Sequence, residues 1–451
     1  MKLALFILTL FAFNVIGQTS DAALRRITQA DNAARDSSGK LPVSSAAEHL
    51  SRAETYMANR LFPQAREHWA IVLEKYPEDA GIPKALFGTA RSFMWEREYG
   101  KAVEWFNKLT KDHLMTKDGR EGLSFKGASY VRMGKNLEAV KAYEQYTVMF
   151  PLGERIESAH LNIIDALREA GKYDEANRWV GITVSKFSGK PTEVNALQAQ
   201  LRMDIYRENW VGAISAADRM LSGKSFSGSM STGDEVRFLR AFAQSRLNKS
   251  GNTPFSLIPR SATSYYSGLA ADRTSGPNVR LISGVTPRYY SDYPVIYRET
   301  VLQHSKKRGV DPRFVLAIMK QESSFKAGAK SPAGARGLLQ LVYDTAIKFN
   351  KAAGYPNLQP DDLYRPEVNI ALGTEYMKFL KDEFDGLYEG IAASYNGGED
   401  NALRWLNRSK PKDPGIFTAE IGFAETKNYV YKVMTNYRIY RELYDENLNR
   451  R

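Results

Sequence analysis

The chain of 451 residues contains no cysteine. Disulfide bonds, thiolate metal sites, iron–sulfur clusters and a cysteine nucleophile are therefore excluded. Histidine is also scarce, and the few that occur stand singly, without the spacing of metal ligands: His49, His68, His113, His160 and His304. We therefore predict no metal site and no cofactor.

Long apolar runs are absent beyond the amino terminus. Residues 3–13 are apolar after a single lysine, and small residues follow near Gly17 and Ser20. This pattern is typical of a cleavable secretory signal, and the run is shorter than the roughly 20 residues that span a bilayer. We expect a signal peptide over residues 1–20, a soluble protein exported to the periplasm and no stable membrane span. A buried N-terminal helix is the alternative.

The charge is unbalanced toward the basic side. Lysine and arginine total 63 against 51 aspartates and glutamates, which gives a net charge of +12. Such a surface favours a polyanionic partner without saying which kind, and export argues against nucleic acid. Apolar residues make up 43% and charged residues 25%, an ordinary globular balance.

A repeat fills the first half of the chain. Alanines recur every 37 residues, at Ala65, Ala102, Ala139, Ala176 and Ala213. Three positions before them stand, in the same order, Phe62, Tyr99, Asn136, Tyr173 and Trp210. Two helices per unit fit this spacing, with small residues where the helices cross and an aromatic residue filling the gap to the next unit. The pattern resembles tetratricopeptide-type repeats and predicts an α-solenoid over residues 40–222.

The solenoid has two possible roles. Its curved surface can bind something long or dock a protein partner, or it can only space and stiffen the rest of the molecule. The serine- and glycine-rich stretch that follows indicates a linker region over residues 223–286. From residue 287 to residue 446 the pattern is helical again, so we predict an all-α fold with two helical parts and a helical linker.

One helix of the second part carries a carboxyl group among apolar residues. Asp311 suits the N-cap and Pro312 the first turn, so the helix should continue through Glu322. Three apolar residues share the face of Glu322: Val315, Ile318 and Met319. Desolvation and the negative end of the helix dipole would both raise the pKa of Glu322. A carboxyl group that stays protonated near neutral pH is what the general acid of glycosidic cleavage requires. The alternative is a frayed helix end with Glu322 in water.

Four sequence blocks then follow in order. They are Gln321-Glu322-Ser323-Ser324-Phe325, the stretch from Ser331 to Gln340 with Thr345-Ala346 behind it, the stretch from Ala392 to Gly398, and the stretch from Glu425 to Val430. Together they resemble the soluble lytic transglycosylases of family 1, whose catalytic domain has a goose-type-lysozyme-like fold. The resemblance covers about Pro287 to Tyr444.

The resemblance implies roles for individual residues. Glu322 would be the only acid/base, and the substrate-binding residues would be Ser323, Gln340, Tyr395, Asn396, Glu425 and Tyr429. The alternatives are that Tyr395 and Tyr429 are core aromatics and that Glu425 is a salt-bridged structural residue. The chain departs from the family pattern at Leu339, Val342, Tyr343 and Ser394, which could reshape the floor of the cleft.

The resemblance further implies an enzyme that cleaves the β-1,4 bond between N-acetylmuramic acid and N-acetylglucosamine in peptidoglycan strands and forms a 1,6-anhydromuramyl end. Two alternatives remain. A hydrolytic muramidase would need a second carboxylate, for which Asp361, Asp362 and Glu399 are candidates. A non-catalytic solenoid scaffold would need no chemistry at all.

Overall fold

The computed structural model describes residues 16–276, 279–282 and 284–451. Within these ranges every regular element is a helix, and β pairing is limited to isolated bridges. The predicted all-α fold is therefore confirmed. The expected signal over residues 1–20 lies, as far as residue 15, outside the described residues, and from Ile16 the chain forms helix α1 (Ile16–Ala34). No described helix is both long and apolar enough to cross a bilayer.

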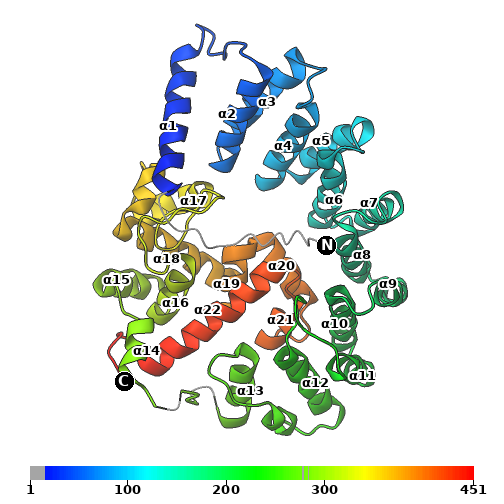
Figure 1. The fold of residues 1–451 in the computed structure, drawn as a ribbon. Coiled ribbons are helices and arrows are strands. Elements are labelled where there is room, and N and C mark those ends of the chain that lie inside the picture. Colours follow the sequence, from blue (N-terminus) through cyan, green and yellow to red (C-terminus); the bar gives the residue numbers. More distant parts are fainter. Residues whose placement is uncertain (1–15, 277–278, 283) are drawn as a thin grey trace.

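The repeat builds a solenoid of antiparallel helices that arcs along one side of the molecule (Figure 1). Its helices are α2 (Ala46–Ala58), α3 (Phe62–Lys75), α4 (Ile82–Trp95), α5 (Tyr99–Asp112), α6 (Lys117–Arg132), α7 (Asn136–Met149), α8 (Ile156–Glu169), α9 (Tyr173–Lys186), α10 (Pro191–Tyr206) and α11 (Trp210–Leu221). The five repeat alanines are all fully buried. The turns between paired helices share a left-handed residue at the same spacing: Arg60, Arg97, Gly134, Gly171 and Glu208.

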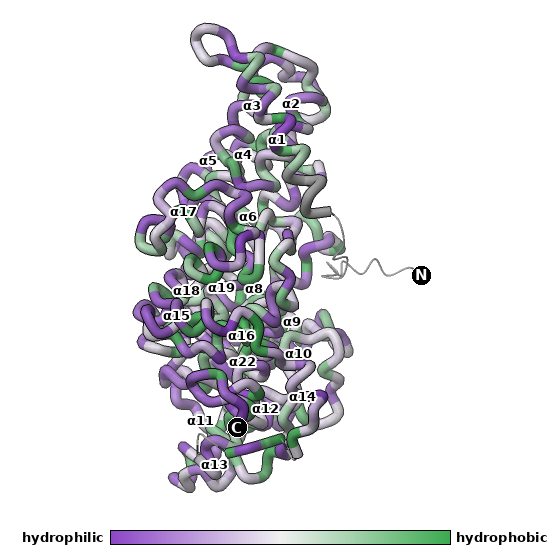
Figure 2. Tube along the Cα trace, turned by 90° about the vertical axis from the view of Figure 1, so that its left-hand side faces the viewer, coloured by the Kyte–Doolittle hydropathy of each residue, from purple (hydrophilic) through white to green (hydrophobic). Residues whose placement is uncertain are grey.

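The segment after the solenoid packs onto its end. Helices α12 (Gly233–Leu247) and α13 (Tyr265–Ser275), with the short helix η1 (Thr253–Leu257) between them, share a hydrophobic core with α10 and α11. Phe238, Phe242 and Tyr266 are among the largest buried side chains of this core. These helices lie at the opposite end of the molecule from α2 and α3 (Figure 2).

The second helical part surrounds α16 with one large core. Its elements are α14 (Pro287–Asp292), α15 (Arg298–Arg308), α16 (Pro312–Ser323), α17 (Tyr343–Ala353), η2 (Pro360–Tyr364), α18 (Pro366–Glu383), α19 (Tyr388–Gly397), α20 (Glu399–Arg408), α21 (Pro414–Glu420) and α22 (Ala424–Leu443). Residues 314–319 of α16 are fully buried, and the long helix α22 packs along them. This burial places the last turn of α16 in the middle of the second part.

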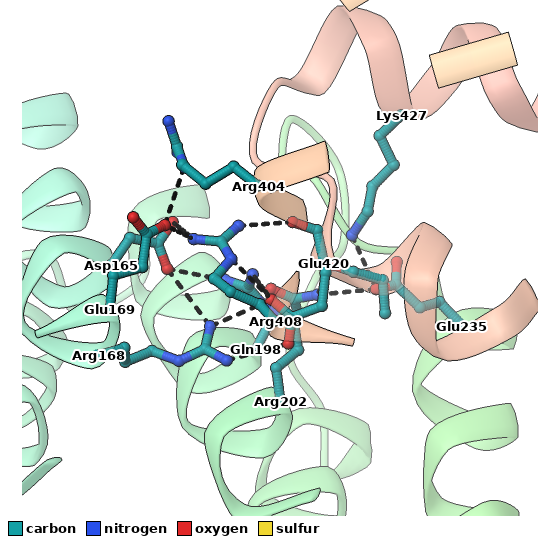
Figure 3. A network of polar contacts seen from close by, with 11 residues as sticks. Asp165, Arg168, Glu169, Gln198, Arg202, Glu235, Arg404, Arg408, Glu420 and Lys427 are labelled. Atoms are coloured by element: carbon teal, nitrogen blue, oxygen red, sulfur yellow. Dashed lines mark hydrogen bonds and ion pairs between the residues drawn. The ribbon is translucent and has the colours of Figure 1, made fainter. Parts of the chain in front are cut away.

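The two halves of the chain meet through a buried cluster of charges, shown in Figure 3. We call it the junction cluster; its members are Asp165, Arg168, Glu169, Arg202, Arg404, Arg408 and Glu420. It joins α8 and α10 of the solenoid to α20 and α21. Charges removed from water are tolerated only when they are paired, so this cluster makes the relative placement of the two halves specific.

Candidate active site

Glu322 lies in the last turn of α16, where the sequence predicted it. Asp311 caps the helix by accepting a hydrogen bond from the Arg313 backbone N–H, and Pro312 occupies the first turn. The helix ends at Ser324, which takes the left-handed conformation with φ of 48°. Glu322 is partly buried. It does not lie in open solvent, which removes the alternative of a frayed end.

The carboxyl group of Glu322 meets the phenol of Tyr429. The Tyr429 hydroxyl donates a hydrogen bond of 2.6 Å to Glu322 Oε1 from the second turn of α22. Burial raises the pKa of Glu322 to about 8, the hydrogen bond from Tyr429 opposes that rise, and the negative charge of Glu425 adds to it. Glu322 is therefore largely protonated at neutral pH and lies close to a group that can stabilise its carboxylate.

Two residues of the third block, Tyr395 and Asn396, contact the loop of Leu339 and the first turns of α22. Tyr395 on α19 is partly buried and donates a hydrogen bond of 3.0 Å to the Leu339 carbonyl. Burial and then the charge of Glu322 raise the pKa of Tyr395, which places the two groups within electrostatic reach of each other. Asn396 is exposed, and its Oδ1 accepts a hydrogen bond of 2.7 Å from the Thr426 hydroxyl.

Gln340 belongs to a tight loop, and its amide serves that loop. Its backbone is left-handed, with φ of 46°, and its Nε2 donates to the carbonyls of Ala329 at 3.0 Å and Gly337 at 2.8 Å. Gly337 is also left-handed, and a Cβ there would lie 2.1 Å from the Leu363 carbonyl oxygen. Gln340 therefore helps to shape the loop that carries it.

Ser323 and Glu425, two of the predicted substrate-binding residues, differ in exposure. Ser323 is a correction: it is only 2% exposed, and its hydroxyl donates to the Leu338 carbonyl at 2.7 Å, so it lies beneath the site and not on its surface. Glu425, by contrast, is exposed on the first turn of α22. Its charge acts on Glu322, so it lies at the rim of the site.

One residue that holds the site together was missed by the sequence reasoning. Asn369 on α18 is fully buried, and its amide donates to the carbonyls of Arg336 and Leu363 while its Oδ1 accepts from the Leu339 N–H. It ties α18 to the loop that carries Gln340. Its signal in the sequence was a single amide among apolar neighbours of a helix, which can also mean a solvated position.

Two of the three candidates for a second carboxylate have partners away from Glu322. Asp361 pairs with Arg25, and Asp362 caps its own short helix by accepting from the Gln359 N–H. Glu399 pairs with Arg97 of the solenoid and accepts a hydrogen bond from Tyr376, whose ring lies 5.4 Å from that of Tyr395. Among the residues that the structure describes, no group of three or more histidines, aspartates or glutamates is arranged to hold a metal ion.

Comparisons with known proteins agree with this geometry. Residues 299–417 match the family model of the transglycosylase SLT domain, and residues 50–112 and 126–179 match a tetratricopeptide-repeat model. The soluble lytic murein transglycosylase of Salmonella typhimurium is 31% identical over 151 residues, which cover 33% of this chain and 23% of that protein. The membrane-bound lytic murein transglycosylase C of Cronobacter sakazakii is 32% identical over 188 residues, which cover 36% of this chain and 52% of that protein.

The chain thus spans between about a quarter and a half of the length of these relatives. The X-ray structure of the lytic transglycosylase Slt from Pseudomonas aeruginosa superposes with a TM-score of 0.50 at 16% identity, over 94% of this chain and 85% of that one. At this identity the superposition shows a shared fold.

Proposed function

We propose that this chain, which carries a transglycosylase SLT domain behind tetratricopeptide-type repeats, is an exported peptidoglycan lytic transglycosylase that acts in the periplasm. It cleaves the β-1,4 bond between N-acetylmuramic acid and N-acetylglucosamine and leaves a 1,6-anhydromuramyl end. The observation that carries this proposal is the partly buried carboxyl group of Glu322, with a pKa of about 8, held by the Tyr429 hydroxyl.

The proposed reaction uses one carboxyl group twice. Protonated Glu322 gives its proton to the glycosidic oxygen, and the bond from that oxygen to C1 of the muramyl sugar breaks. The positive charge that develops at C1 is stabilised by the carbonyl of the neighbouring N-acetyl group. The Glu322 carboxylate then accepts the proton of the C6 hydroxyl while O6 forms a bond to C1. The protonated form of Glu322 is thereby restored, and no water is consumed.

Among the residues that the structure describes, Glu322 is the one carboxyl group that bonds Tyr429 at the centre of the site, and Glu425 lies exposed at its rim; this arrangement favours the route over hydrolysis. Ordinary glycosidases divide the work between two carboxyl groups that flank the scissile bond. The hydrogen bond from Tyr429 strengthens when Glu322 becomes an anion, so it stabilises the state that follows proton transfer. We assign Gln340, Tyr395, Asn396 and Glu425 to the surface that faces the sugars, and Tyr429 to the acid/base.

The same proposal covers the organisation of the chain. Residues 1–20 are the signal peptide, residues 40–222 the solenoid, residues 223–286 the linker region and residues 287–446 the catalytic domain. Among the described residues, the cores formed within the solenoid and within the second part support the outer domains, while one further core joins the linker region to α10, α11 and α21.

The test compares wild type with Glu322→Gln on purified peptidoglycan sacculi, with the products identified by mass spectrometry. We expect wild type to release anhydro ends and Glu322→Gln to release none while still binding sacculi. Glu383→Gln, which changes an exposed glutamate of α18, is the matched control and should cleave normally. Turnover by Glu322→Gln would refute the assigned role. Reducing ends from wild type would favour the muramidase, and no cleavage at all would favour the scaffold.

A further inference from the structure

A cavity lies beside the junction cluster, between the solenoid and helix α20. Its volume is about 300 Å³, enough for a fragment the size of a dipeptide. The lining residues that matter here are Asn136, Tyr173 and Tyr206 from the solenoid and Arg404, Asn407 and Arg408 from α20. None of them belongs to the site around Glu322.

The charges of the junction cluster do not balance. It contains four guanidinium groups and three carboxylates. Arg168 and Arg202 each contact both Asp165 and Glu420, and Arg408 contacts all three carboxylates. The cluster therefore carries one positive charge more than it neutralises.

The surplus charge is located on Arg404. It contacts Glu169 only through Nε, at 2.9 Å, and its two terminal amino groups make no hydrogen bond or ion pair with any residue that the structure describes. In Figure 3 the end of its guanidinium group points away from the carboxylates of the cluster. The Arg404 side chain is 23% exposed and lines the cavity, so its guanidinium group is partly accessible. A planar fork with two free N–H₂ groups is the geometry that binds a carboxylate through two hydrogen bonds.

The opposite wall of the cavity offers groups of another kind. Asn136 contributes to this wall, but its Oδ1 is buried below the cavity surface. The side chain of Asn407 is exposed at the rim, and its amide oxygen can accept a hydrogen bond from an N–H group. The rings of Tyr173 and Tyr206 stand 6.4 Å apart and give the wall an aromatic surface. A ligand that satisfies these groups has a carboxylate for Arg404 and an amide N–H for Asn407.

We propose that this cavity binds a carboxylate that is adjacent to an amide, as found in the peptide stems of peptidoglycan. The identity of the source as a peptide stem rests on the proposed function, whereas the chemistry of the ligand rests on Arg404 and Asn407 alone. The cavity would hold a stem of the strand while a glycosidic bond lies at Glu322. The solenoid is then a part of the substrate-binding surface.

The probe is N-acetyl-D-alanyl-D-alanine, which has a carboxylate and amides but no sugar, titrated calorimetrically into the full chain. Its C-terminal amide is the uncharged control probe. We expect the acid to bind at least roughly tenfold more tightly than the amide, because one charge-assisted pair is lost. Equal binding of the two probes, or no binding of the acid at millimolar concentration, would overturn the proposal.

Three variants locate the site. Arg404→Gln should weaken binding of the acid by roughly tenfold or more. Asn407→Asp, which places a negative charge at an exposed rim position and leaves the junction cluster intact, should do the same even where Arg404→Gln folds poorly. Arg178→Gln removes an exposed charge of α9 outside the cavity and should bind like wild type. The site would be refuted if both Asn407→Asp and a correctly folded Arg404→Gln bound the acid with wild-type affinity.

Sacculus cleavage measured on the same preparations separates the two proposals. Normal cleavage without probe binding would reject the cavity alone, and probe binding without any cleavage would reject the proposed function alone.

Discussion

Replacing the catalytic carboxyl group should make the protein more stable. Folding holds the pKa of Glu322 at about 8, whereas the unfolded chain has the ordinary value of 4.5. Between these two values the unfolded state releases the proton and the folded state keeps it, so stability falls as pH rises from 4.5 and levels off above 8. Glu322→Gln has the same shape and no proton to lose. Its advantage over wild type is therefore absent below pH 4.5 and complete above pH 8.

The size of the effect follows from the same two values. Each pH unit between them corresponds to about 1.4 kcal/mol, which gives an upper bound of roughly 3 kcal/mol at pH 7. Because Glu322 is only partly buried in the folded chain, solvent screening reduces this to roughly 1 to 2 kcal/mol. For a domain of this size that corresponds to a rise of roughly 2 to 8 °C in melting temperature.

Calorimetric melting of wild type and Glu322→Gln at pH 4, 5.5, 7 and 8 measures the difference directly. The other titrating groups are present in both proteins, so they cancel. For Glu383→Gln, an exposed substitution of the same type, the difference in melting temperature from wild type should not change with pH. A gap between wild type and Glu322→Gln that is constant across this range, or a variant less stable than wild type at pH 7, would show that Glu322 is not held in its neutral form by folding.

Three further predictions follow from single contacts. Tyr429→Phe removes a hydrogen bond that lowers the pKa of Glu322, so the alkaline limb of the pH–rate profile on sacculi should move to higher pH. Glu425→Gln removes a like charge that raises this pKa, so the alkaline limb should move to lower pH. Shifts of the two variants in the same direction would contradict the assignment. Gly337→Ala should cost roughly 3 kcal/mol of stability in urea unfolding, because its Cβ would meet the Leu363 carbonyl at a left-handed position, whereas Gly386→Ala, left-handed in open space, should cost only about 1 kcal/mol. Burial lowers the pKa of both His49 and His68 below 6.5, so the folded state binds fewer protons and stability should be lost as pH falls below 6.5; melting between pH 7.5 and 5 should show this loss in wild type and less of it in His68→Gln.

The parts of the fold that could be predicted are those in which local pattern and burial coincide. The alanines spaced by 37 residues are buried because each lies where two helices cross, and Asp311 with Pro312 starts α16 because both side chains suit the first turn. Composition was less informative after the solenoid. Serine and glycine indicated a connector, and the same stretch also contains Phe238 and Phe242, which pack α12 into a core with α10 and α11.

The candidate site could be predicted as a set of residues but not as a set of contacts. Glu322, Tyr395 and Tyr429 come from blocks far apart in the sequence, and only tertiary packing decides that the Tyr429 hydroxyl reaches the carboxyl group. Ser323 shows the limit from the other side. It stands next to Glu322 in the chain, yet helical geometry turns it into the core.

The turns at the amino-terminal end of the solenoid support bracing, one of its two predicted roles. Arg60 and Arg97 occupy left-handed positions that Gly134 and Gly171 fill in later repeats, and a side chain there costs roughly 1 kcal/mol or more. Both arginines leave the solenoid: Arg60 forms two hydrogen bonds of 2.6 and 2.7 Å to Asp344 at the start of α17, and Arg97 pairs with Glu399 at the start of α20.

The same end of the solenoid also holds the loop of the candidate site. Asn59 Oδ1 accepts hydrogen bonds from Lys330 at 3.0 Å and from Arg336 at 3.3 Å, and both residues belong to the loop that carries Gln340. Glycine at these two turns would fit the backbone better and would make none of the contacts of Arg60 and Arg97. Two of the strained residues, Arg60 and Arg97, thus occur where the solenoid touches the elements around Glu322, while Glu208 holds the same left-handed position in the last repeat and pairs with Lys410. Gly171, one of the relaxed residues, borders the cavity beside the junction cluster. The array of repeats therefore supplies two surfaces, a brace at its first turns and a ligand-sized cavity at its later ones.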